Sequence, residues 1–283
     1  MRYAILSDIH ANLPALTAVL TDLAERKVDH IFYLGDAIGY GPHPREVVAK
    51  LQQIVSAHPC VIAGVMQTSL IWLTGNHEWY LANRADPEVF AKVVEDARMS
   101  IELTHEELSV AAYNHLCNLP SVIDLNLDGL SVTLCHASLS DPVGTYTYIT
   151  DTIAASTEMQ RTPSQICILG HTHYPRVFRE TETRIGGHLI WEKIDLWNED
   201  QPVSTYQFAD ERLVFNPGSV GQPRDGDPRA AYAILDSHER SFSVYRIAYD
   251  IEQTQSDLRS WLGSRLPNLD SMQGLAGRLA CGL

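Results

Sequence analysis

The sequence has no long hydrophobic run, and we expect no leader segment. No stretch of the 283 residues comes near the roughly eighteen consecutive apolar residues that a membrane-spanning helix needs. Met1 runs almost directly into YAILSDIH, which reads as a core strand and not as a signal peptide. Repeats, low-complexity tracts and linkers are also missing. We therefore expect no membrane partner and one domain over residues 1–283, with a core over about 1–250 and a helical tail over about 251–283.

Cysteine is scarce, and its pattern argues against a disulfide framework. The number is odd, the spacing is wide, and no CxxC pair occurs. Buried, reduced thiols are the simplest interpretation, and they favour a cytoplasmic location. The five positions are Cys60, Cys117, Cys135, Cys167 and Cys281.

Positive charge is also in short supply. The chain has 21 basic and 35 acidic residues, a formal net charge of −14. Such a field repels a phosphate-rich polymer, so we expect no nucleic-acid polymer as a partner. A small anionic substrate would need local positive charge, from a few arginines or from metal ions.

The first hundred residues alternate between strand and helix patterns. The pattern predicts a strand over 3–6, a helix from Pro14, a strand over 30–34 and a second helix around 47–55. This order is typical of βαβ units with parallel strands. A helix is predicted over 87–101, and a capping box at Thr104–Glu107 predicts another that ends near Pro120. 

Beyond Pro120 strands dominate. Asp128-Gly129 predicts a two-residue hairpin between strands 121–127 and 130–135. Further strands are predicted at 165–170, 184–191, 203–207, 212–215, 230–236 and 242–248, with a short helix near 151–159. Together the patterns predict an α/β sandwich of mixed sheets with helices outside.

Five predicted strands end in Asp, Asn or His. Because ligands bind at the carboxyl ends of strands in parallel α/β sheets, we expect these side chains to share one site. Any one motif is common in ordinary loops, so the hypothesis depends on all five. The segments are Asp8-Ile9-His10, Gly35-Asp36, Gly75-Asn76-His77-Glu78, Cys135-His136 and Gly170-His171-Thr172-His173.

The residue types at these strand ends predict a pair of metal ions. Two divalent cations ~3.5–4 Å apart need several neutral nitrogens and carboxylate oxygens. In Asp8-x-His10 and His171-x-His173 the outer residues can share one face of an extended segment. The mixture of His, Asp and Asn suits Mn, Fe or Zn better than Mg or Ca, and we favour Mn.

These motifs together resemble the calcineurin-like metallophosphoesterase superfamily over about residues 1–250. The segments GDAIGYGPHP (35–44) and NPGSVGQPRDGDPRAAYAILD (216–236) are similar to the bacterial branch described as diadenosine-tetraphosphatase or Ser/Thr-phosphatase related. The resemblance implies the superfamily's four-layer α/β/β/α sandwich.

The resemblance also implies roles for individual residues. One metal ion would be held by Asp8, His10 and His173, and the other by Asn76, His136 and His171, with Asp36 bridging them. His77 would donate to a phosphate oxygen or to the leaving group, and Glu78 would orient His77. Asn76 would also lie against the substrate, and Arg224, rather than Arg229, would bind a phosphate.

The implied function is metal-dependent hydrolysis of a phosphoester or phosphoanhydride in a small phosphorylated substrate. Metal ions would lower the pKa of a water from 15.7 toward ~7, and His77 would protonate the departing oxygen. A nucleotide such as a dinucleoside polyphosphate is the first expectation, followed by a cyclic nucleotide or other phosphodiester and then a phosphoprotein. A non-catalytic scaffold of the same fold is the alternative from another class. The sequence leaves the substrate, the metals and the oligomeric state open.

Two segments depart from the family pattern. Residues 61–74 contain what looks like an insertion, which either brings Met66 or Trp72 near the pocket or bulges outside; we favour the bulge. Residues 180–210 are longer and more polar than the family core, and could cover the site or build a subunit interface.

Overall fold

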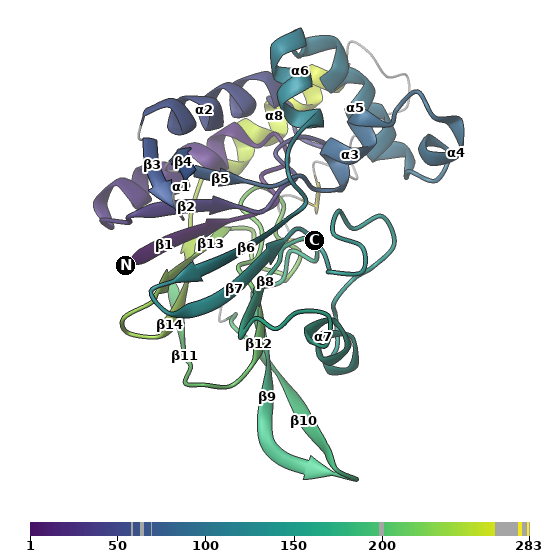
Figure 1. Ribbon diagram of the computed structural model, residues 1–283. Coiled ribbons are helices and arrows are strands. Elements are labelled where there is room, and N and C mark those ends of the chain that lie inside the picture. The colour runs from purple at the N-terminus through teal and green to yellow at the C-terminus, as the bar shows by residue number, and fades with distance from the viewer. Residues whose placement is uncertain are drawn as a thin grey trace.

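The structure is a computed structural model that describes residues 1–57, 59–62, 65–68, 70–197, 201–263, 277–278 and 282. Two six-stranded sheets lie face to face, with most helices on one side and a single helix against the other sheet (Figure 1). The four-layer α/β/β/α architecture is therefore confirmed.

The first sheet is formed by strands from both ends of the chain. It is mixed: the N-terminal strands run parallel to one another, and the C-terminal strands pair antiparallel. Its order is β11 (Val203–Gln207), β14 (Ser241–Ile247), β13 (Ala230–Asp236), β1 (Arg2–Leu6), β2 (His30–Tyr33) and β5 (Leu70–Trp72).

The second sheet comes from the middle of the chain and is also mixed. It includes the hairpin predicted at Asp128-Gly129, where both residues have positive φ, 54° and 94°. The order is β10 (His188–Asp195), β9 (Arg176–Ile185), β12 (Leu213–Asn216), β8 (Ile166–Ile168), β7 (Leu130–Cys135) and β6 (Val122–Leu127).

Helices cover the outer faces of the sandwich. The helices on the side of the first sheet are α1 (Leu13–Glu25), α2 (Pro44–Ala57), α3 (Asn76–Ala82), α4 (Pro87–Phe90), α5 (Glu95–Glu107), α6 (Val110–Cys117) and α8 (Ile251–Gly263), and α4 lies at the edge of this layer. The second sheet carries α7 (Thr152–Met159), capped by the Asp151 carboxylate. No helix in the described ranges is long and apolar enough to cross a bilayer.

Strand β1 contributes side chains to two hydrophobic cores, one on each face of its sheet. Tyr3 and Ile5 point into the core between the two sheets, whereas Ala4 and Leu6 point into the core under the helices. All four are buried, because both faces of the strand are covered. A third apolar cluster lies between the second sheet and α7.

Two predicted helices have different boundaries in the structure. The helix predicted over 87–101 is split into α4 and α5, since the chain turns to bury Val93 and Val94 is extended. Thr104 does not start a helix; it is fully buried inside α5, and Ser109 caps α6 instead, accepting a hydrogen bond from Ala112 N at 3.2 Å.

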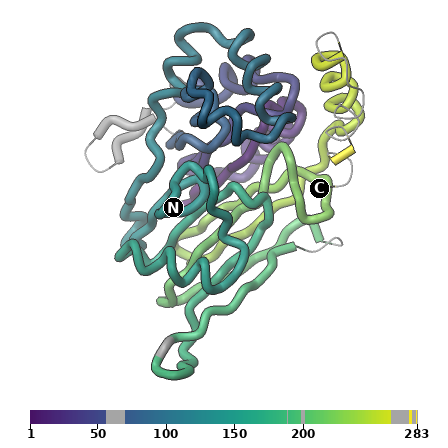
Figure 2. The backbone as a smooth tube through the Cα atoms, turned by 90° about the vertical axis from the view of Figure 1, so that its right-hand side faces the viewer, coloured from purple at the N-terminus to yellow at the C-terminus, as the bar shows by residue number. Residues whose placement is uncertain are grey.

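The prediction of one strand over 184–191 is wrong, because a turn interrupts this segment. Gly186 and Gly187, with φ of 58° and 84°, join the long strands β9 and β10. Their hairpin extends away from the helices to the far end of the molecule (Figures 1 and 2). It begins beside the GHTH segment and runs away from it, so it does not cover that segment.

The insertion near residues 61–74 forms its own two-stranded sheet. Strands β3 (Pro59–Ile62) and β4 (Val65–Thr68) pair only with one another among the described strands. Trp72 lies in β5, is buried in the helix-side core and contacts the ring of Tyr33 edge-on. It is therefore a core residue, and the side chain of Met66 lies outside the described residues.

The thiols that can be described are free. Cys117 is partly buried, and Cys135 and Cys167 are fully buried. The side chain of Cys60 and all of Cys281 lie outside the described part of the chain, as does most of the predicted tail beyond Gly263.

Candidate metal centre

The five strand ends meet at one edge of the sandwich. Asp8 and His10 follow β1, Asp36 follows β2, and Asn76 opens α3 after β5. From the second sheet, His136 follows β7, and the HTH segment follows β8. All seven predicted ligands are buried: Asp8, His10, Asp36, Asn76, His136, His171 and His173.

Five of these ligands adopt a backbone conformation that non-glycine residues rarely take. Their φ angles lie between 48° and 63°, in the left-handed region, at a cost of about 1 kcal/mol each. Such conformations persist only where surrounding bonds hold them. The residues are Asp8, His10, Asp36, His171 and His173.

Hydrogen bonds between the loops supply that restraint. His10 N donates to Asp36 O at 2.9 Å, which joins the loops after β1 and β2. His171 N donates to Asp8 Oδ2 at 3.1 Å, and His77 N donates to Asp36 Oδ1 at 2.8 Å. Each carboxylate thus fixes a neighbouring loop with one oxygen and leaves the other oxygen directed at the cluster.

The first group of ligand atoms comprises Asp8, His10 and His173. The Nε2 atoms of the two histidines lie 3.2 Å apart, and Asp8 Oδ1 lies 3.1 Å from His173 Nε2. On the other side of each ring, His10 Nδ1 is 3.2 Å from Ile38 O and His173 Nδ1 is 2.5 Å from Gln222 O. A carbonyl only accepts, so both Nδ1 atoms carry the hydrogen and a neutral ring presents a lone pair at Nε2.

The second group lies on the other side of Asp36. His136 Nε2 is 3.3 Å from Asp36 Oδ2 and 3.2 Å from Asn76 Oδ1, while its Nδ1 is 2.9 Å from Leu34 O. The ligand atoms of Asp36, His136 and His171 all lie within 4.8 Å of one another. Asp36 Oδ2 is also 3.8 Å from His10 Nε2, so this oxygen lies between the two groups.

Acceptor atoms therefore face acceptor atoms in both groups. Buried Asp8 Oδ1 and His171 Nε2 have no hydrogen-bond donor among the described residues. Leaving such groups unpaired away from water is costly. A cation between them removes the repulsion, and neutral imidazole and carboxylate are the ligands that Mn, Fe and Zn accept. The donor set thus fits metal ions.

The electrostatics of the histidines point the same way. Burial lowers the pKa of His136, but the carboxylates of Asp36, Asp8 and Glu78 together outweigh it and raise this pKa to about 9. Burial and the neighbouring His136 lower the pKa of His171 to about 3. In the metal-free chain Asp36 therefore favours a positive charge on His136, which a bound cation would replace, whereas the ring of His171 stays neutral.

His77 lies beside the cluster with an unengaged ring nitrogen. Its ring is 4.8 Å from that of His10, and its buried Nδ1 has no hydrogen-bond partner in the described structure. Burial lowers its pKa to about 4, against the opposing effect of Asp36, so the free ring is neutral at pH 7. A neutral imidazole still offers one N–H donor.

Glu78 is directed at the backbone and not at the ring of His77. Its carboxylate accepts from Asp36 N at 2.9 Å, Ala37 N at 2.8 Å and Gly75 N at 2.9 Å. Burial, then the Asp36 charge, raises its pKa to about 7. The contacts indicate that Glu78 holds the Asp36 loop against the start of α3.

Arg224 lies near the cluster, whereas Arg229 is engaged elsewhere. Arg224 Nη2 donates to Gln222 Oε1 at 3.0 Å. Burial lowers the pKa of His173, and the Arg224 charge lowers it further, which puts the guanidinium within electrostatic range of the ligands. Arg229 makes an ion pair with Asp227 at 2.6 Å.

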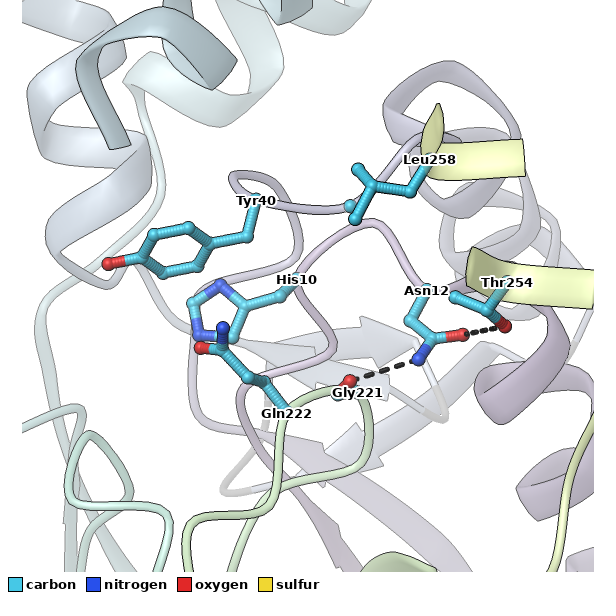
Figure 3. Close-up of a pocket in the computed structure, with 8 residues that line it drawn as sticks. His10, Asn12, Tyr40, Gly221, Gln222, Thr254 and Leu258 are labelled. Carbon is cyan, nitrogen blue, oxygen red and sulfur yellow. Dashed lines mark hydrogen bonds between the residues drawn. The ribbon is translucent and has the colours of Figure 1, made fainter. Parts of the chain in front are cut away.

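Several supporting residues were not predicted from the sequence. Asn216 Nδ2 donates to Gly170 O at 2.5 Å and to Thr172 Oγ1 at 3.1 Å, which braces the HTH segment. A small pocket beside His10 adds Asn12, whose side chain donates to Gly221 O and accepts from Thr254 of α8 (Figure 3). The sequence Asn-Pro-Gly at the end of β12, which favours a turn, could have drawn attention to Asn216. No sequence pattern pointed to Asn12.

Comparison with known proteins identifies the family. Residues 1–240 match the calcineurin-like phosphoesterase superfamily domain. An uncharacterized protein of Methanocaldococcus jannaschii is 29% identical over 272 residues, which is 93% of this chain and 96% of that protein.

Solved structures agree with this match. A metallophosphoesterase from Sphaerobacter thermophilus is 32% identical, with a TM-score of 0.74 over 100% of this chain and 99% of that one. A hypothetical protein of Pyrococcus horikoshii OT3, 18% identical, has the same fold, with a TM-score of 0.72 over 97% of both chains. With its converging strand ends and its buried His and Asp groups, this chain belongs to the calcineurin-like phosphoesterase superfamily.

Proposed function

We propose that the protein is a phosphoesterase that depends on two divalent metal ions and hydrolyses a phosphoester or phosphoanhydride of a small nucleotide, such as a dinucleoside polyphosphate. The observation that carries the proposal is the pair of buried acceptor groups on either side of Asp36 Oδ2. Asp8, His10 and His173 would hold one ion, Asn76, His136 and His171 the other, and Asp36 both.

When bound, the two ions would activate water and neutralise charge on the phosphate. The other roles fall to this chain's side chains. His77 donates its N–H to a phosphate oxygen or to the departing oxygen, a contribution of about 10²–10⁴ in rate. Arg224 binds a phosphate oxygen that points away from the metal-ligating side chains.

The test is hydrolysis of p-nitrophenyl phosphate, bis-p-nitrophenyl phosphate and a dinucleoside tetraphosphate by protein stripped of metal and reloaded with Mn²⁺. We expect activity that requires the metal and that falls by at least about 100-fold in Asp36→Asn and His77→Ala. Full activity in either variant would refute the assigned roles.

The same preparations separate the enzyme from a non-catalytic scaffold. A scaffold would bind no Mn, Fe or Zn and would gain no thermal stability when these ions are added.

The phosphate role of Arg224 has its own matched control in the same loop. Arg224→Ala should raise KM about tenfold, whereas Arg229→Ala, which removes a guanidinium already paired with Asp227, should leave KM unchanged.

A further inference from the structure

Two tyrosines are exposed on the loop between β7 and α7. The side chains of Tyr146 and Tyr148 are 70% and 51% exposed, among the most exposed large hydrophobic residues described. Tyr148 nevertheless lies against the metal cluster, because its ring stacks on that of His171 with centroids 4.2 Å apart. Large exposed aromatic surface beside a functional site is typical of a ligand contact.

Two further tyrosines flank the other side of the cluster. The ring of Tyr40 lies 4.6 Å from that of His77 and 5.0 Å from that of His10. Figure 3 shows the Tyr40 hydroxyl directed away from His10. Tyr80, one helical turn after His77 on α3, has its ring 6.0 Å from that of His77.

These four rings belong to one neighbourhood, which we call the tyrosine rim: Tyr40, Tyr80, Tyr146 and Tyr148. Burial raises the pKa of Tyr80, and the charges of Asp36 and of the three other tyrosines raise it further. Tyr80 therefore lies within electrostatic range of the other three phenols, which come from two other segments of the chain.

The exposed part of the rim is held in place. The Asp141 carboxylate accepts from Tyr146 N at 2.7 Å and from Thr147 N at 3.1 Å. Gly144 packs so closely that an added Cβ would lie 3.0 Å from His171 Cε1. The loop is thus anchored to the cluster, so its tyrosines are presented in a fixed position rather than ordered only when a ligand arrives.

Positive charge accompanies the rings. The Lys92 ammonium lies 6.0 Å from the centre of the Tyr146 ring. Burial raises the pKa of Tyr148, and the Arg224 guanidinium opposes that rise. On a chain with a net charge of −14, cations beside exposed aromatic rings suit a ligand that combines a planar group with negative charge.

We propose that the tyrosine rim binds a planar aromatic group of the substrate by stacking, while the phosphate lies against the metal cluster. The inference rests on the proposed function and narrows its substrate class. The planar group is a nucleobase in a nucleotide or the ring of an aryl phosphate, and both present the same chemistry to the rim.

Tyr146→Ala tests the proposal without touching a metal ligand. The substrate pair is AMP and ribose 5-phosphate, which differ only in the base, and the readout is Kd by equilibrium dialysis on the Mn-loaded protein. We expect the wild type to bind AMP about 5- to 100-fold more tightly. Tyr146→Ala should bring this ratio toward one, and Tyr146→Phe, which keeps the ring, should preserve it.

Ile185→Ala is the matched control, since Ile185 is also 70% exposed but lies at the far tip of the β9–β10 hairpin. Phosphotyrosine and phosphoserine form a second pair. If Tyr146→Ala removes the preference for AMP over ribose 5-phosphate only, the occupant is a nucleobase. If it removes the preference for phosphotyrosine over phosphoserine only, the occupant is an aryl ring. Equal Kd values within both pairs, or ratios that Tyr146→Ala leaves unchanged, would overturn the proposal.

Hydrolysis of the same four compounds separates this proposal from the proposed function. Preferential binding of the aromatic member, with no hydrolysis of these four compounds, of the two p-nitrophenyl esters or of the dinucleoside tetraphosphate, would refute the phosphoesterase and leave the rim intact. Hydrolysis with no preference in Kd would refute the rim alone.

Discussion

At the scale of single residues, the candidate metal-binding cluster combines strain with unpaired acceptors. Asp36 illustrates both: its φ is 60°, one carboxylate oxygen holds His77 N, and the other lies between two imidazole groups. Neither feature stabilises the metal-free chain. Both become useful when a cation is bound, so the residues around Asp36 must hold it in place beforehand.

Glu78→Gln tests whether Glu78 performs that task. The substitution puts an amide NH₂ among backbone N–H donors that now bind a carboxylate. We expect a loss of about 2–3 kcal/mol in stability and weaker Mn²⁺ binding, measured by thermal unfolding and metal titration. Unchanged metal affinity with a reduced kcat alone would instead support the sequence-based expectation that Glu78 orients His77.

The residue types of the cluster could be predicted, but not its supporting contacts. Asp, Asn and His at strand ends were visible because each motif stands directly after an apolar run. The stacking of Tyr148 on His171 was not visible, since these residues come from different segments and their approach depends on tertiary packing. The contacts of Glu78 were hidden for the same reason.

At the scale of helices and strands, local sequence patterns predicted an element correctly where a single pattern was present. Asp128-Gly129 correctly predicted a hairpin, and the apolar stripe correctly predicted α1. Thr104 failed because burial in α5 overrode a local capping pattern. The turn at Gly186-Gly187 was missed although two adjacent glycines favour such a turn, because the flanking residues suggested one continuous strand.

Asp22 links α1 to the first sheet and gives stability a pH dependence. Its carboxylate accepts from Arg26 at 2.6 and 2.8 Å and from the Tyr232 hydroxyl of β13. The hydrogen bonds from Arg26 hold the pKa of Asp22 below its ordinary value. A lowered folded-state pKa stabilises the protein above the unfolded-state pKa, and this contribution is lost as pH falls through the folded-state value.

Asp22→Asn should therefore cost about 1–2 kcal/mol at pH 7, and the difference from wild type should shrink as pH falls below ~4. Urea unfolding of wild type and variant at pH 7 and pH 3 measures the cost at pH 7 and its decrease at low pH. Glu25→Gln removes the same charge from an exposed position of the same helix and serves as the control. An equal cost for Asp22→Asn at both pH values would contradict the linkage.

At the scale of the whole molecule, the two sheets share one core. Phe215 of β12 and Phe242 of β14 stack across the sheets with ring centroids 4.0 Å apart. The first sheet contains β1 and β2 from the start of the chain and β13 and β14 from its last third, so neither pair of strands can detach without opening the sheet. We therefore propose that the chain unfolds as a single domain.

Phe242→Ala should destabilise the protein by about 3–5 kcal/mol, because Phe242 is fully buried. Calorimetry of the metal-free protein should show one transition in both wild type and variant. Two separated transitions, only one of them shifted by the substitution, would contradict a shared core.

The most direct test of the central claim is the location of metal in the Mn-loaded protein, by anomalous X-ray scattering from a crystal. The account predicts two manganese ions per chain, one among Asp8, His10 and His173, the other among Asn76, His136 and His171, with Asp36 touching both. No manganese in the cluster, a single ion at full occupancy, or rings of His171 and His173 turned away from the metal would contradict it.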